Sequence, residues 1–184
     1  YRPRLRPPPR PALGPGRFGM AHETGRILNE IAVAASKNSH GFGHAVGAYL
    51  SREQVRFRDR SLLAVADELK IPVTVHVALG TDIVHMHPLA SGSAIGDVSL
   101  RDFRYFTSCV ARLKGGVYIN CGSAVVLPEV FLKAVALARD RGADLSGLTT
   151  INIDFQRMYR PQTNVVVRPV AGVDGVGISL VGHH

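Results

Sequence analysis

The sequence predicts an α/β fold in which helices cover both faces of a mostly parallel β-sheet, giving a domain of three layers. The first observation is the order of elements: from about residue 71 onward, short β-branched runs alternate with stretches of helical periodicity. The second is their spacing, because most gaps between these runs can hold the helix that a parallel connection needs. The third is composition, because 46% hydrophobic residues in a chain of 184 suit one folded core and argue against wholesale disorder.

Helical patterns come first along the chain. Residues 22–37 repeat apolar side chains at helical spacing, and a glycine-interrupted helix is expected over about 42–50. A clearer helix is expected over 60–70, with Asp59 as its N-cap. The β-branched run at 73–77 then predicts the first strand.

The second half of the chain alternates strands and helices. Ser99 to Asp102 resembles a capping box with Asp in place of the usual Glu, and it predicts a helix that reaches about residue 113. A further helix has Pro128 in its first turn and ends at Arg141, before Gly142. Four more strands are expected over residues 117–121, 149–155, 165–167 and 177–181.

The charge of the chain is concentrated at its start. A net charge of +8 and a pI near 10.1 would by themselves suggest a nucleic-acid partner. Residues 1–17, however, hold five arginines, six prolines and no acidic residue, and without those arginines the net charge falls from +8 to +3. We therefore expect a disordered leader over residues 1–17, one α/β domain over 18–184, and no nucleic-acid partner.

Two further features of the sequence, its hydropathy and its cysteine content, indicate the cellular compartment in which we expect the protein. No apolar run approaches the roughly 20 residues that a membrane-spanning helix needs, so no membrane partner is expected. Cys109 and Cys121 are too few for a disulfide framework in a domain of this size. We expect both to be buried, reduced thiols in a cytoplasmic protein.

Ligands of parallel sheets bind beyond the carboxyl ends of the strands, and three loops there carry polar side chains. In the first loop, Asp82 lies near three imidazoles, those of His76, His85 and His87. Imidazoles and a carboxylate could ligate zinc, one histidine could act on a substrate, or the side chains could only make structural hydrogen bonds. The sequence leaves these three interpretations open.

The other two loops offer groups for a nucleotide. Gly122 and Ser123 join a strand to a helix, and such a turn either cradles a phosphate or is a plain tight turn. Asp154, at a strand end, could accept hydrogen bonds from ribose hydroxyls, while Arg157 and Arg160 could bind phosphate or carboxylate. Alternatively, the aspartate and the arginines form only a surface ion pair.

The order of these motifs resembles the deoxyhypusine synthase family, in a divergent bacterial form, from about residue 60 to the end. The motifs are Ile71-Pro72-Val73, Asp82 to His87, Gly115-Gly116-Val117-Tyr118-Ile119, Gly122-Ser123-Ala124-Val125-Val126, Ile151-Asn152 and Arg160-Pro161. The resemblance implies a Rossmann-like, NAD-binding domain and a homo-oligomer, usually a tetramer. Enzymes of the family oxidise spermidine with NAD, form an imine on an enzyme lysine and pass an aminobutyl group to a lysine of a translation factor.

The chain departs from the family pattern at the catalytic lysine. The family carries a Trp-Gly-Lys tripeptide, whereas this chain has no tryptophan and continues from Arg160-Pro161 into Gln162-Thr163. Arg168 cannot form the imine, because a guanidinium stays protonated and is a weak nucleophile. The family pattern also extends past both ends of this chain, which is therefore expected to be incomplete.

These observations predict an NAD-binding protein, a transferase or oxidoreductase acting on a polyamine, another amine or a protein lysine. His87 is the expected catalytic residue, because it falls near the active-site histidine of the family. Arg157 and Arg160 are expected to bind substrate. The expected cofactor-binding residues are Gly80, Thr81, Asp82, Gly122, Ser123, Asn152 and Asp154. A metal-dependent hydrolase built on the His76, Asp82, His85 and His87 cluster and a non-catalytic, ligand-binding descendant are the alternatives.

Overall fold

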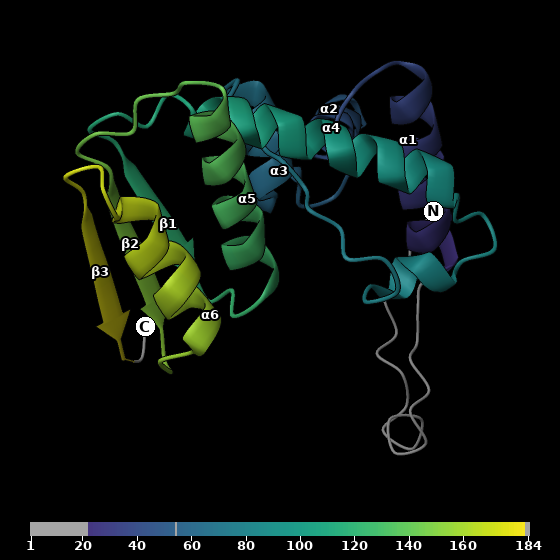
Figure 1. The fold of residues 1–184 in the computed structure, drawn as a ribbon. Helices are drawn as coiled ribbons and strands as arrows, with labels where there is room; N and C mark the ends of the chain where they lie inside the picture. Colours follow the sequence, from purple (N-terminus) through teal and green to yellow (C-terminus); the bar gives the residue numbers. More distant parts are fainter. Residues whose placement is uncertain (1–21, 54, 183–184) are drawn as a thin grey trace. The chain divides into compact units, whose positions relative to one another are not determined.

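The computed structural model describes residues 22–53 and 55–182 and shows a mixed α/β protein (Figure 1). The chain divides into two compact units, with the boundary between Asp102 and Phe103. They are called here the N-terminal and the C-terminal unit, and each is described by itself. The predicted leader, residues 1–17, lies outside the described residues. None of the helices between residues 22 and 182 is both long and apolar enough to cross a bilayer.

The N-terminal unit begins with three helices, as predicted. Helix α1 (His22–Lys37) buries an apolar stripe that includes Ile31 and Ala35, and helix α2 (Phe42–Arg52) follows it. Helix α3 (Leu62–Glu68) starts after Ser61, whose hydroxyl accepts a hydrogen bond from the Ala64 N–H. The predicted N-cap at Asp59 is therefore wrong, and this residue lies in the short 3₁₀ turn η2 (Arg58–Arg60).

Helix α2 packs closely against its neighbours because two of its residues lack side chains. A Cβ atom at Gly43 would overlap the carbonyl group of Val73. One at Gly47 would lie 2.8 Å from the carbonyl oxygen of Leu63, on α3. Glycines make the sequence pattern of this helix weak, but they also allow its backbone to approach Val73 and helix α3 closely.

The strand predicted at residues 73–77 does not form. Its backbone donors are taken instead by side chains of helix α4 (Gly92–Val110). The carboxylate Oδ2 of Asp102 accepts from the Val75 N–H at 2.8 Å, and Ser99 Oγ accepts from the Val77 N–H at 3.2 Å. These bonds satisfy donors that a ladder would otherwise have used.

Helix α4 also begins earlier than the sequence predicts. Its first turn follows Ser91, whose Oγ accepts a hydrogen bond from the Ala94 N–H at 3.3 Å. Ser99 and Asp102 therefore lie inside the helix, and the predicted capping box is wrong. Both side chains are used to hold the segment 71–78.

The C-terminal unit holds the parallel sheet that the alternating pattern predicts. Strands β1 (Val117–Cys121), β2 (Thr149–Asp154) and β3 (Val176–Val181) pair in parallel, in the order β1-β2-β3. Helix α5 (Val126–Asp140) connects the first two strands. Helix α6 (Tyr159–Pro161) and the turns η4 (Gln162–Val167) and η5 (Arg168–Val170) connect the last two.

Both connections pack on the same face of the sheet. Tyr118, Thr150 and Gly177 form one cross-strand row. The Tyr118 ring stacks on Phe131 of α5 with ring centroids 3.5 Å apart, and a Cβ at Gly177 would overlap the Val166 carbonyl of η4. The sequence predicts three layers, with helices on both faces of the sheet. The described residues of this unit form two layers, the sheet and the helices on one of its faces.

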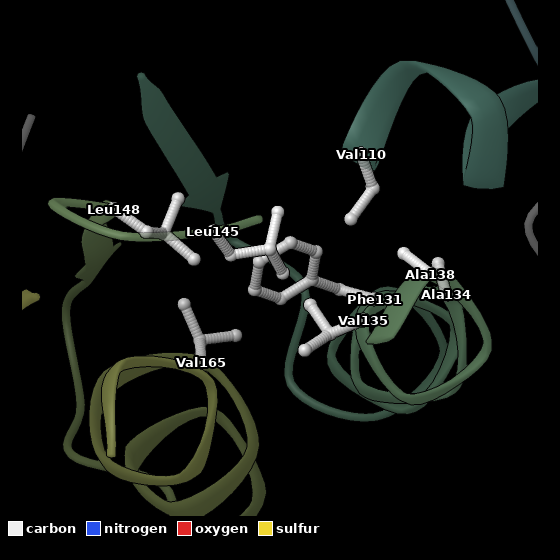
Figure 2. Close-up of a cluster of buried hydrophobic side chains, with 8 residues drawn as sticks. All are labelled: Val110, Phe131, Ala134, Val135, Ala138, Leu145, Leu148 and Val165. Atoms are coloured by element: carbon white, nitrogen blue, oxygen red, sulfur yellow. The ribbon is translucent and has the colours of Figure 1, made fainter. Parts of the chain in front are cut away.

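The core of the C-terminal unit lies between this covered face and the helices (Figure 2). Val165 belongs to it, although residues 165–167 are predicted as a strand. That prediction is wrong, because the segment forms the π-helical turn η4, packed against α5, β2 and β3. Tertiary packing here overrides the β-propensity of three consecutive valines. The buried side chains of the core are Val110, Phe131, Ala134, Val135, Ala138, Leu145, Leu148 and Val165.

The close approach of α2 is testable with two alanine substitutions at helical glycines. Gly43→Ala is expected to lower the free energy of unfolding by about 1–3 kcal/mol, because the backbone of Val73 must move. Gly96→Ala, in α4, is expected to raise it by about 0.5–1 kcal/mol, since a Cβ there meets nothing within 4 Å. Urea denaturation measures both, and equal effects of the two substitutions would contradict the packing of α2.

Candidate functional site

The turn after β1 exposes backbone at the carboxyl edge of the sheet. Gly122 has φ +68°, a left-handed conformation that favours glycine, and a Cβ built there would meet nothing within 4 Å. Its N–H donates to the Ile153 carbonyl at 3.0 Å, which fixes the turn against β2. Ser123 Oγ accepts from the Leu127 N–H at 3.2 Å, in the first turn of α5. The turn is held in place while its outer side stays open to a ligand.

A row of polar side chains lies just below this turn on the covered face. Asn120, Asn152 and Ser179 are cross-strand neighbours, and both asparagines are almost fully buried. Asn120 Nδ2 donates to Asn152 Oδ1 at 2.7 Å and to the Ser123 carbonyl at 2.9 Å. Asn120 therefore connects the turn to β2. The sequence predicts Asn152 as a site residue but misses Asn120 and Ser179, which polar positions in otherwise apolar strands could have indicated.

Several buried oxygens of the C-terminal unit have no hydrogen-bond partner within residues 22–53 and 55–182. They are Asn120 Oδ1, Thr150 Oγ1, Gln162 Oε1 and Ser179 Oγ. Buried polar atoms nearly always find a partner, so four of them in one unit call for a donor from outside the protein, either a ligand or water. Gln162 opens the π-helical turn η4, and such turns often mark functional sites.

Asp154 ends β2 and supplies the one buried carboxylate of this edge. Its side chain is 4% exposed, and Oδ1 accepts from the Gln156 N–H at 3.4 Å. The arginines expected near it behave differently. Arg160 Nε lies 3.4 Å from Glu129 Oε1, while Arg157 is exposed and makes no ion pair in the described part of the chain. The surface ion pair considered for Asp154 is therefore formed by Glu129 instead.

The first-loop residues lie in the N-terminal unit and hold their own loop together. Gly80 N–H donates to His85 Nδ1 at 3.1 Å, and the Thr81 hydroxyl donates to the Ala78 carbonyl at 2.7 Å. Asp82 Oδ1 accepts from the Val84 N–H at 3.0 Å and caps the short turn η3 (Ile83–Met86). The three residues expected to bind cofactor here are thus engaged in local hydrogen bonds.

His87 is buried in the same unit and both of its ring nitrogens have partners. Nδ1 accepts from the Leu89 N–H at 3.2 Å, so the ring proton lies on Nε2, which is 3.2 Å from His22 Nδ1. The two rings are tilted, with centroids 4.8 Å apart. His22 lies at the start of α1, and the sequence gives no signal that it would meet His87.

A metal site would require at least three metal-ligating side chains close together, and the described residues contain no such group. No group of three or more His, Cys, Asp or Glu side chains with metal-binding geometry occurs within the described ranges. The His76 Nε2 atom lies 3.0 Å from Thr74 Oγ1. The cysteines are both free thiols. Cys121 is exposed and Cys109 is only half-buried, so the predicted burial of both is wrong.

Two ionisable groups of the N-terminal unit are perturbed by burial. Burial raises the pKa of Asp102, opposed by its hydrogen bonds from the Gly43 and Val75 N–H groups. Burial lowers the pKa of His76, and the nearby Asp102 carboxylate acts in the opposite direction. The sequence predicts Asp102 as part of a capping box. Its hydrogen-bond partners, Gly43 and Val75, could not be predicted because they lie far from it along the chain.

No family model, no curated protein and no solved structure matches this chain. The resemblance to the deoxyhypusine synthase family therefore depends on the sequence motifs alone.

The burial of His76 predicts a dependence of stability on pH. The pKa of His76 in the folded chain is lowered from its ordinary 6.5. Between this lowered pKa and pH 6.5, the unfolded chain therefore binds a proton that the folded chain does not. This contribution to stability is present above pH 6.5 and is lost as the pH falls toward the lowered pKa. Urea denaturation between neutral and acidic pH is expected to show a smaller loss for His76→Gln than for the unaltered protein, and identical pH profiles would contradict this.

Proposed function

We propose that the chain is an NAD-binding, deoxyhypusine-synthase-like protein that acts on a polyamine or another amine as a transferase or oxidoreductase. The observation that carries the proposal is the parallel β1-α5-β2 unit, which has a left-handed glycine after its first strand and a buried carboxylate at the end of its second. Dinucleotides bind to units of this kind at the carboxyl edge of the sheet. The motif resemblance supports the same function.

The described residues fit a nucleotide in three respects. Gly122 leaves room for a phosphate oxygen beside the backbone, because a Cβ built there would meet nothing within 4 Å. Asp154 is a hydrogen-bond acceptor for ribose hydroxyls and has no cationic partner among the described side chains. Ser123 and Asn152 would complete the contacts, with Asn120 holding both in position. Bound NAD would supply the hydride acceptor for oxidation of an amine.

The unpartnered oxygens favour a substrate that donates hydrogen bonds. Gln162 Oε1 and Asn120 Oδ1 can only accept, and the Ser179 hydroxyl can accept as well. A protonated or neutral amine supplies such donors. Arg157 carries no ion pair in the described ranges, so it remains available for a phosphate or carboxylate of cofactor or substrate, whereas Arg160 is held by Glu129.

A second candidate function is ligand binding without catalysis. It is favoured by the segment around Arg168, which has no lysine where the deoxyhypusine synthase family carries its catalytic one. Arg168 Nη1 donates to Asn164 Oδ1 at 3.2 Å, and Pro169 is buried, so this segment offers no amine that could form an imine. A cytoplasmic location belongs to the main proposal, as does the tetramer that the resemblance implies. His87 stays a proposed catalytic residue on the resemblance alone.

Calorimetric titration with NAD tests the proposal. The protein is expected to bind NAD, and Asp154→Asn is expected to weaken binding by about 10- to 100-fold, because the bond to ribose loses its charged acceptor. Asp140→Asn, at an exposed position that ends α5, is the matched control and is expected to bind as the unaltered protein does. Absence of binding at millimolar NAD would refute the function.

A turnover assay separates the two candidate functions. Incubation of the NAD-bound protein with spermidine or another amine is expected to produce NADH, measured by its absorbance. Binding of NAD without reduction by any amine would favour the non-catalytic descendant.

A further inference from the structure

Two carboxylates are buried in the described part of the chain, those of Asp102 and Asp154, and they differ in their hydrogen bonds. Asp102 Oδ2 accepts from the Gly43 and Val75 N–H groups at 3.0 and 2.8 Å. Within the same described residues, the Asp154 side chain accepts one bond, from the Gln156 N–H at 3.4 Å. A carboxylate can accept about four, and its burial is costly unless hydrogen bonds or a cation compensate. Asp154 therefore has acceptor capacity left for a donor from outside the protein.

The position of Asp154 is fixed beside the Gly122 turn. The Gly122 N–H donates to the carbonyl of Ile153, the residue before Asp154, at 3.0 Å. On the other side, the Asp154 carbonyl accepts from the Gly182 N–H at 3.1 Å, directly after β3. The backbone of Asp154 is thus held from both neighbouring strands, and its buried side chain has little freedom to turn away from a ligand.

We propose that Asp154 makes the site selective for NAD over NADP, an inference that rests on the proposed function. The two cofactors differ at the 2′ position of the adenosine ribose, which carries a hydroxyl in NAD and a phosphate in NADP. The hydroxyl can donate a hydrogen bond to the carboxylate, whereas the phosphate brings negative charge against it. In open α/β sheets an acidic residue on the ribose is typical of NAD sites, and an arginine near it is typical of NADP sites.

The described surroundings of Asp154 offer no cation that would offset this repulsion. Its side chain forms no ion pair within residues 22–53 and 55–182, and Arg160 is held by Glu129, with Nε 3.4 Å from Oε1. Arg157 is exposed, whereas the Asp154 carboxylate is 4% exposed. Water screens charges less where they are buried, so the carboxylate is expected to decide which cofactor is accepted.

Calorimetric titration of the full chain with NAD and with NADP tests the selectivity. The unaltered protein is expected to bind NADP at least about 100-fold more weakly than NAD, because like charges that meet in a buried site are strongly unfavourable. In Asp154→Asn the binding of NAD weakens and the repulsion of NADP is lost, so the ratio of the two dissociation constants is expected to fall to about 10 or less. Asp154→Ser, with a smaller neutral side chain, is expected to lower the ratio in the same way. Asp140→Asn is the matched control at an exposed position and is expected to keep the ratio of the unaltered protein.

The ratio separates selectivity from folding, because partial loss of the fold weakens the binding of both cofactors alike. Equal binding of both cofactors to the unaltered protein, or a preference for NADP, would overturn the selectivity and leave the proposed function in place. The role of Asp154 is overturned in the same way if its two variants keep the original ratio, or if Asp140→Asn lowers the ratio as much as they do. Absence of binding by either cofactor would refute the proposed function, and this inference with it.

Discussion

The strand order of the C-terminal unit is the constraint from which its chemistry follows. Because β1, β2 and β3 pair in sequence order and in parallel, two connections of the same hand must return over the same face. That face receives the core of Phe131 and Val165, and it also receives Asn120 and Asn152. The helices thus cover polar side chains at the carboxyl edge, where a ligand would enter, and apolar ones further in.

Burial gives the polar row its potential use. An exposed asparagine exchanges hydrogen bonds with water at little net gain, whereas a buried acceptor without a partner costs about 1–3 kcal/mol. The unpartnered oxygens of Asn120, Thr150 and Ser179 therefore lower the stability of the folded chain, and a hydrogen bond from a ligand or water would offset this loss.

The parts of the fold that depend on local pattern were predictable, and the parts that depend on distant contacts were not. Helical periodicity gives α1 and α5, and β-branched alternation gives β1, β2 and β3. The segment at 73–77 has the composition of a strand, but Asp102 and Ser99 occupy its donors, and no local signal predicts that. The turn at Gly122 and the polar strand end at Asp154 are recognisable from the sequence, whereas the partner of His87, at His22, is 65 positions away.

The proposed function separates two chemical steps, nucleotide binding and imine formation, which enzymes of the deoxyhypusine synthase family combine. Holding a nucleotide needs an open turn and an acceptor at the neighbouring strand end, and the proposed function assigns these parts to Gly122 and Asp154. Forming an imine needs a nucleophilic amine, and the segment around Arg168 offers only a guanidinium. Hydride transfer from an amine to NAD requires no enzyme lysine, because the oxidised amine can be released or hydrolysed. Within the proposed function, this set of residues therefore favours oxidation of an amine over transfer of its carbon chain through an enzyme-bound intermediate.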